Sequence, residues 1–205
     1  MTRARGAIAD ERDPWGAVVA LGVTQITAWG SIYYSFALLM EPLQAALGAS
    51  KSAVVGAFSV SLLMSGLLSP LVGRHIDRQG GRLVMAAGSV LGGIGLCSLA
   101  YVNTLVQLYA VWAILGVAMA ATLYDPAFAV LTKAFRSNYR RAITALTLFG
   151  GFASTVFWPI TALLISTLGW RPRPLGLPIE HEGLSICAWT IEPSESALRS
   201  TLRAY

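Results

Sequence analysis

The sequence predicts an all-α fold: a polytopic membrane helical bundle of five transmembrane helices, followed by an irregular C-terminal tail. Two observations predict it. Hydrophobic residues make up 55% of the chain and charged residues only 12%, against about a quarter charged in an ordinary soluble domain. The charged residues also gather in short clusters, and the stretches between them are long enough to cross a bilayer as helices.

Each span is placed by the absence of charge, since a helix needs about 20 apolar residues to cross about 30 Å of hydrocarbon. The first, residues 15–40, ends at Glu41 and Pro42 and is longer than the apolar run of a secretory signal, about 7–15 residues. Another charge-free stretch begins at Leu83, and the polar residues 101–104 divide it into two spans. We therefore expect spans at residues 15–40, 52–72, 83–101, 105–131 and 142–168.

The chain outside the membrane domain, residues 15–170, falls into two segments. Residues 1–14 form a short N-terminal segment rich in arginine. Residues 171–205 carry three prolines within their first eight residues, which a helix would not tolerate, and then several glutamates. We expect this divergent tail to be largely disordered.

The basic residues predict the orientation, because short cytoplasmic loops of membrane proteins are enriched in lysine and arginine. They lie in the connections after the second and fourth spans: Arg74, Arg78, Arg82, Lys133, Arg136, Arg140 and Arg141. We expect both connections and the N-terminus to be cytoplasmic, in a multi-pass protein of the cell (inner or plasma) membrane. The net charge of +5 is spread over separate connections and forms no single face, which argues against nucleic-acid binding.

Residues 73–82 read GRHIDRQGGR and lie between the second and third expected spans. This resembles the loop 2–3 signature of the major facilitator superfamily, G-x-x-x-D-R-x-G-R-R/K. The matching residues are Gly73, Asp77, Arg78, Gly80 and Arg82, while Gly81 stands where a basic residue is usual. The resemblance covers about residues 15–170 and implies the N-terminal half of a transporter. It also implies a cytoplasmic gate, in which Asp77 latches this half against a helix of the C-terminal half in the outward-facing state. The alternative is a solvated, positively charged connection with no further role.

Several of these residues have a physical interpretation of their own. Gly73 lets the second span end closely against a neighbour, Gly80 permits a tight turn, and Asp77 can pair with basic residues at the membrane surface. Gly88 and Gly92 form a GxxxG pair in the third span, which indicates either close helix packing or only the abundance of glycine in membrane helices.

Asp125 is an acidic residue inside an expected span, which makes it a functional candidate. One interpretation is a proton-coupling or cation-binding group. The other is an ion pair of the cytoplasmic gate, with Arg78, Arg140 or another basic residue. Asp125 precedes Lys133 by two helical turns, about 12 Å at 1.5 Å per residue, and this depth favours the gate.

The first span carries four polar or aromatic residues, Gln25, Trp29, Tyr33 and Tyr34. The family resemblance implies that this helix lines the central cavity, so they are candidates for contact with the solute. Interfacial anchoring or helix packing is the alternative. Trp29 and Tyr33 are four residues apart and share a helical face.

The remaining expectations concern activity. No nucleophile–base pair and no metal-ligand spacing occurs, so we expect no enzymatic activity, no metal and no cofactor. We expect transmembrane transport of a small solute, with or without a coupling ion, by a secondary transporter of the major facilitator type. The change in character after Arg171 indicates a truncated, inactive fragment whose C-terminal half is missing. The alternative is a five-span accessory or binding subunit that pairs with another chain in the lipid bilayer.

Overall fold

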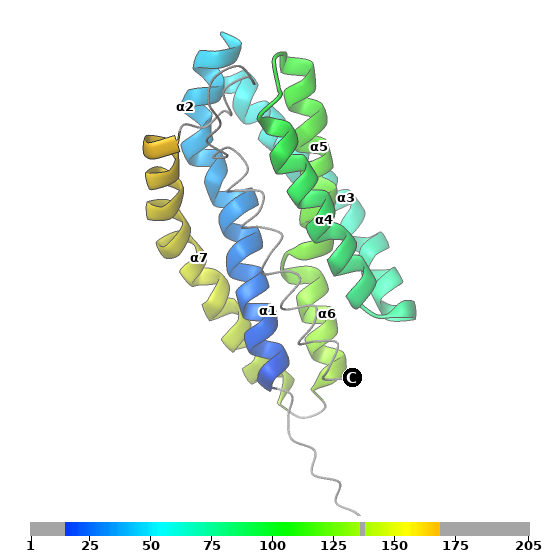
Figure 1. The fold of residues 1–205 in the computed structure, drawn as a ribbon. Coiled ribbons are helices and arrows are strands. Elements are labelled where there is room, and N and C mark those ends of the chain that lie inside the picture. The colour runs from blue at the N-terminus through cyan, green and yellow to red at the C-terminus, as the bar shows by residue number, and fades with distance from the viewer. Residues whose placement is uncertain (1–14, 136–137, 169–205) are drawn as a thin grey trace, which may run out of the picture.

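The computed structural model describes residues 15–135 and 138–168, and within these ranges the chain forms helices and no strand. This confirms the all-α fold. Figure 1 shows long helices that run lengthwise beside one another. In chain order they are α1 (Trp15–Ala28), a π-helical turn η1 (Trp29–Tyr34), α2 (Ser35–Leu47), α3 (Lys51–Gln79), α4 (Arg82–Leu99), α5 (Leu105–Thr122), α6 (Tyr124–Ala134) and α7 (Tyr139–Leu168).

Five helical rods in the described residues are long and apolar enough to cross a membrane, which confirms the expected bundle. They are Trp15–Leu47, Lys51–Gln79, Arg82–Leu99, Leu105–Ala134 and Tyr139–Leu163. Two of these rods are interrupted: η1 lies within the first, and a break between α5 and α6 lies within the fourth. The N-terminal segment 1–14 and the tail 171–205 lie outside the described residues.

The first rod continues past the point at which the sequence predicts its end. Pro42 lies inside α2, and the helix runs on to Leu47. Leu43, which is only 1% exposed, packs the segment after the proline into the bundle. The helix ends at Gly48, whose φ of 57° is left-handed and whose N–H donates to the carbonyl of Gln44.

The signature after the second span is helical for most of its length. We expected the span to end at residue 72, but α3 continues through Pro70 and residues 73–79 to Gln79. Gly80 then turns the chain with a φ of 86°, and its N–H donates to the carbonyl of Ile76 at 2.9 Å. Arg74, Asp77 and Arg78 of the signature therefore project from α3, and Arg82 is the first residue of α4.

The helices form two groups, one around α1 and one around α5. In Figure 1, α7 runs beside α1, and α3, α4 and α5 lie together on the other side of the first rod. The GxxxG pair lies in the contact between α4 and α5: a Cβ on Gly88 would stand 2.6 Å from Ala121 Cβ, and one on Gly92 3.6 Å from Ala118 Cβ. These glycines therefore allow close packing, as the first of the two interpretations has it.

The contact between α3 and α5 is closer still. A Cβ on Gly116 would stand 2.3 Å from the carbonyl oxygen of Ser61 and 2.8 Å from its Cα. Beside this contact lies an aromatic group in which Trp112, fully buried, packs edge-on against Phe36 and Phe58 at 5.1 and 5.3 Å between ring centroids. Trp112 is thus part of the core.

Candidate functional site

The fourth rod is broken at Leu123, the residue between α5 and α6. Leu123 has an extended backbone, with φ −75° and ψ −159°. Pro126 follows in the first turn of α6 and is buried. In an unbroken helix the carbonyl of Thr122 would accept from the N–H of residue 126, which proline lacks. The carbonyl of Thr122 therefore has no donor from its own helix at this position.

Gln25 of α1 supplies the missing hydrogen-bond donor. Its Nε2 donates to the carbonyl of Thr122 at 2.8 Å and to that of Leu123 at 3.3 Å. The side chain is fully buried, so these hydrogen bonds are shielded from water. Gln25 thus lies between α1 and the break, and its contact there is to backbone.

The π-helical turn gathers aromatic side chains beside the same break. The Trp29 ring lies 5.0 Å from Tyr33, 6.3 Å from Tyr34 and 5.0 Å from Tyr124 between centroids. Tyr124, the first residue of α6, also stacks on Phe128 at 5.2 Å. The wide turn brings a side chain five residues on, Tyr34, onto the face that Trp29 and Tyr33 share, which a regular α-helix would not do.

Two polar side-chain atoms of the first rod, one in α1 and one in η1, have no hydrogen-bond partner within the described residues. They are Gln25 Oε1, an acceptor, and Trp29 Nε1, a donor, and both are buried. Both side chains also touch the break, Gln25 through the carbonyls and Trp29 through Tyr124. A third such atom, Trp112 Nε1, lies in the aromatic core around Phe36. An unpartnered polar group in an apolar interior costs free energy.

Asp125 lies in the first turn of α6, with an exposed side chain. It accepts a hydrogen bond from Ser69 Oγ of α3 at 2.9 Å. In the part of the chain that the structure describes, no ion pair joins it to Arg78 or Arg140. Its position at the start of a helix suits a carboxylate, because the exposed N–H groups carry partial positive charge there.

The signature residues lie at the far end of α6 from the break. Lys133 Nζ stands 3.2 Å from Asp77 Oδ1 and donates to the carbonyl of Ile76 at 2.9 Å. Lys133 therefore joins the last turn of α6 to the last turn of α3. Gly73 has open space where a Cβ would point, so its close approach to a neighbour does not occur among the described residues.

Gly81, which departs from the family pattern, lies against α6. A Cβ on Gly81 would stand 2.2 Å from Val130 Cγ2. A basic side chain at this position would need Val130 to move. The neighbouring signature arginines, Arg78 and Arg82, are exposed.

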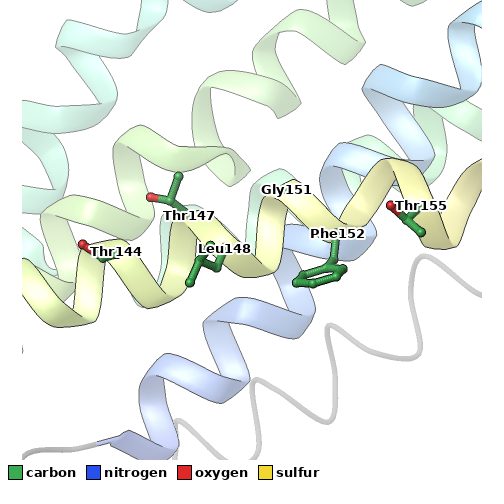
Figure 2. A pocket seen from close by; sticks show the side chains of 6 residues that line it. All are labelled: Thr144, Thr147, Leu148, Gly151, Phe152 and Thr155. Atoms are coloured by element: carbon green, nitrogen blue, oxygen red, sulfur yellow. The ribbon is translucent and has the colours of Figure 1, made fainter.

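A shallow depression of about 310 Å³ lies elsewhere, along one face of α7. Figure 2 shows that its lining side chains all come from this helix. They are Thr144, Thr147, Leu148, Gly151, Phe152 and Thr155. None of the site residues predicted from the sequence is among them.

Sequence reasoning missed three features of this region: the π-helical turn, the hydrogen bond from Gln25 to the break, and Lys133 as a partner of Asp77. Pro126 directly after Asp125 was a signal for the break, since proline removes a donor from a helix. The partners themselves depend on which helices lie together, and no local pattern in the sequence specifies that.

Comparison with known proteins identifies the family. Residues 20–172 match the model of the Major Facilitator Superfamily. Similar proteins include monocarboxylate transporter 11 of Mus musculus, 27% identical over 87% of this chain and 40% of that protein. Monocarboxylate transporter 1 of Homo sapiens is 27% identical over 77% of this chain and 32% of its own length. The chain thus spans less than half the length of these relatives. The helical bundle, the signature at the end of α3 and the match over most of the chain agree: this protein belongs to the major facilitator superfamily.

Proposed function

We propose that this chain supplies helices of the N-terminal half of a secondary transporter that carries a small monocarboxylate across a cell membrane. The proposal rests chiefly on the helix break between α5 and α6. Two side chains with an unpartnered polar atom lie against this break: Gln25 of α1, through Oε1, and Trp29 of η1, through Nε1. The solute class comes from the names of the relatives, which are monocarboxylate transporters. The arginine and lysine pattern supports a cytoplasmic location for the Asp77 end.

The chemistry at the break suits this solute. Discontinuous helices form substrate sites in several transporter folds, and the N-terminal end of a half-helix favours a carboxylate. Trp29 Nε1 can donate to a carboxylate oxygen, while the rings of Tyr124 and Tyr33 offer apolar faces to the rest of a small organic acid. Gln25 Oε1 can accept from a hydroxyl group or a water.

Asp125 is the candidate site for a coupling proton. A charged carboxylate in the first turn of α6 would repel an anionic solute at the same break. A proton on Asp125 would remove that repulsion and would leave the hydrogen bond from Ser69 possible. We therefore propose that Asp125 takes up the proton that travels with the solute. If Asp125 instead formed an ion pair of the gate, a neutral residue at this position would leave proton coupling intact.

Alternating access needs an opposing set of helices, and two faces of this bundle suit them. Gly66 and Gly73 on α3 and Gly151 on α7 have open space where a Cβ would point. Small residues on an exposed face allow close contact between membrane helices. The Asp77–Lys133 pair stands at the end of the α3 face, where the signature's latch would operate.

Uptake by the native assembly tests the proposal. The tagged chain is purified in a mild detergent with whatever stays bound to it, and is reconstituted into liposomes with an inward proton gradient. We expect saturable uptake of labelled pyruvate that lactate inhibits and the neutral ester methyl pyruvate does not. Uptake equal to that of protein-free liposomes would contradict the proposal. Binding of pyruvate without any flux would favour the accessory or binding subunit instead.

A further inference from the structure

The hydrogen bond from Gln25 meets a specific deficit in the backbone. The carbonyl of residue i in an α-helix accepts from the N–H of residue i+4. For Thr122 that residue is Pro126, which has no N–H. The carbonyl instead accepts from Gln25 Nε2 at 2.8 Å, and that of Leu123 accepts from the same nitrogen at 3.3 Å.

We propose that Gln25 is a positioning residue, whose amide replaces the donor that Pro126 lacks and so fixes the direction in which α6 leaves α5. Gln25 is fully buried and Thr122 is 5% exposed, so water has little access to the carbonyl. In the hydrocarbon region a free carbonyl is costly, which makes a fixed donor from a neighbouring helix effective. Among the described residues, Gln25 Nε2 donates only to these two carbonyls at the break.

The direction of α6 matters because this helix carries functional candidates at both ends. Its first turn holds Tyr124 against Trp29, and Asp125 beside it. Its last turn holds Lys133 in the ion pair with Asp77. A change at the break would therefore move the proposed solute site and the signature together. This consequence rests on the proposed function, but the role of the amide at the break does not.

A double-mutant cycle tests the role. Gln25→Met keeps the length of the side chain and removes the amide, and Pro126→Ala restores a backbone N–H at position 126. Hydrogen bonds between membrane helices contribute about 0.6 to 1.7 kcal/mol, which corresponds to about a threefold to twentyfold change in the folding equilibrium constant. We expect Gln25→Met to lower that constant by this factor in the wild-type chain and to have little effect in the Pro126→Ala background.

Thr27→Val serves as the matched control. Thr27 is also a buried polar residue of α1, but its hydroxyl donates to the carbonyl of Val23 in its own helix at 3.0 Å. Its replacement should have the same effect in both backgrounds. Stability is measured by reversible unfolding in mixed detergent micelles on the full chain.

A distance measurement separates positioning from a loss of packing. Spin labels are introduced as non-natural amino acids at Val106 on α5, which is 79% exposed, and at Thr132 on α6. We expect Gln25→Met to broaden the distribution of distances between them. The variant that combines it with Pro126→Ala should match Pro126→Ala alone. If Gln25→Met alone does not fold, the distance distributions of the double variant and of Pro126→Ala are still compared, and a difference between them would contradict the inference.

Two results would overturn the inference. One is an equal effect of Gln25→Met in both backgrounds, because the amide would then not act through the missing N–H. The other is a distance distribution that Gln25→Met leaves unchanged. Neither measurement uses a solute, so either result would leave the proposed transport function to be decided by the uptake assay.

Discussion

Replacing Gly116 with alanine should destabilise the bundle strongly, although the substitution adds only one methyl group. The added Cβ would stand 2.3 Å from the carbonyl oxygen of Ser61 and 2.8 Å from the Ser61 Cα. Carbon–oxygen contacts are normally at least about 3.3 Å, so α3 and α5 must separate locally by about 1 Å. Both obstructing atoms are backbone, so no side-chain rotation relieves the clash.

The expected cost follows from this geometry. Overpacking of a well-packed core costs about 1–3 kcal/mol, and the rigid obstruction at Gly116 places this variant near the upper value. Gly66→Ala on α3 is the matched control, because a Cβ there meets nothing within 4 Å. Helix propensity favours alanine by about 0.5–1 kcal/mol at both positions, since both lie inside helices. The two variants should therefore differ by the overpacking cost alone, about 3 kcal/mol in free energy of unfolding.

Reversible unfolding by added dodecyl sulfate in mixed micelles, followed by circular dichroism, measures this difference. A difference of about 3 kcal/mol corresponds to more than a hundredfold ratio between the two folding constants. If the free energies of unfolding of Gly116→Ala and Gly66→Ala agreed within about 0.5 kcal/mol, the close approach of α3 and α5 would be wrong.

Two further predictions use the same unfolding assay. Asp77→Asn should change the free energy of unfolding by less than about 1 kcal/mol, because the ion pair between Asp77 and Lys133 is exposed to solvent. Lys133→Met should lower it more, since Lys133 Nζ also donates to a carbonyl in the last turn of α3. Equal effects would argue against that second bond. Gly150→Ala should destabilise the bundle, because the added Cβ would stand 1.9 Å from the Tyr124 hydroxyl oxygen. Tyr124→Phe should relieve part of this loss, since it removes the hydroxyl and leaves the ring carbon Cζ at 2.7 Å. Gly151→Ala, with nothing within 4 Å of the added Cβ, is the control without a clash. A loss that Tyr124→Phe leaves unchanged would place the clash elsewhere.

The fold could be predicted from the sequence because membrane spans depend on local composition. The charge-free stretches predicted the five apolar helical rods of the described residues, and the signature near Asp77 pointed to the family whose model matches. Helix ends were less predictable. Pro42 and Pro70 both lie inside helices. At Pro42 the buried residues Leu39 and Leu43 hold the chain on both sides of the missing donor.

The candidate site was predictable only as a set of residues. Gln25, Trp29, Tyr33 and Tyr34 were found because polar and aromatic residues are distinctive within a first span. Their arrangement was not, because the π-helical turn and the position of Gln25 against the carbonyl of Thr122 depend on how α1 packs on α5 and α6. Partners distant in the chain are set by tertiary packing, which a single sequence does not specify.

Equilibrium binding of labelled pyruvate to the native assembly in lipid nanodiscs tests the central claim most directly, namely that solute binds at the α5–α6 break beside α1. Trp29→Phe removes the unpartnered Nε1 and keeps an aromatic ring against Tyr124. Trp158→Phe is its control, since Trp158 is 49% exposed on α7. A hydrogen bond to a charged group contributes about 1.5–3 kcal/mol, so Trp29→Phe should raise the dissociation constant at least about tenfold and Trp158→Phe should leave it unchanged. Equal affinity in the wild-type chain and both variants would contradict the placement of the solute site at the break.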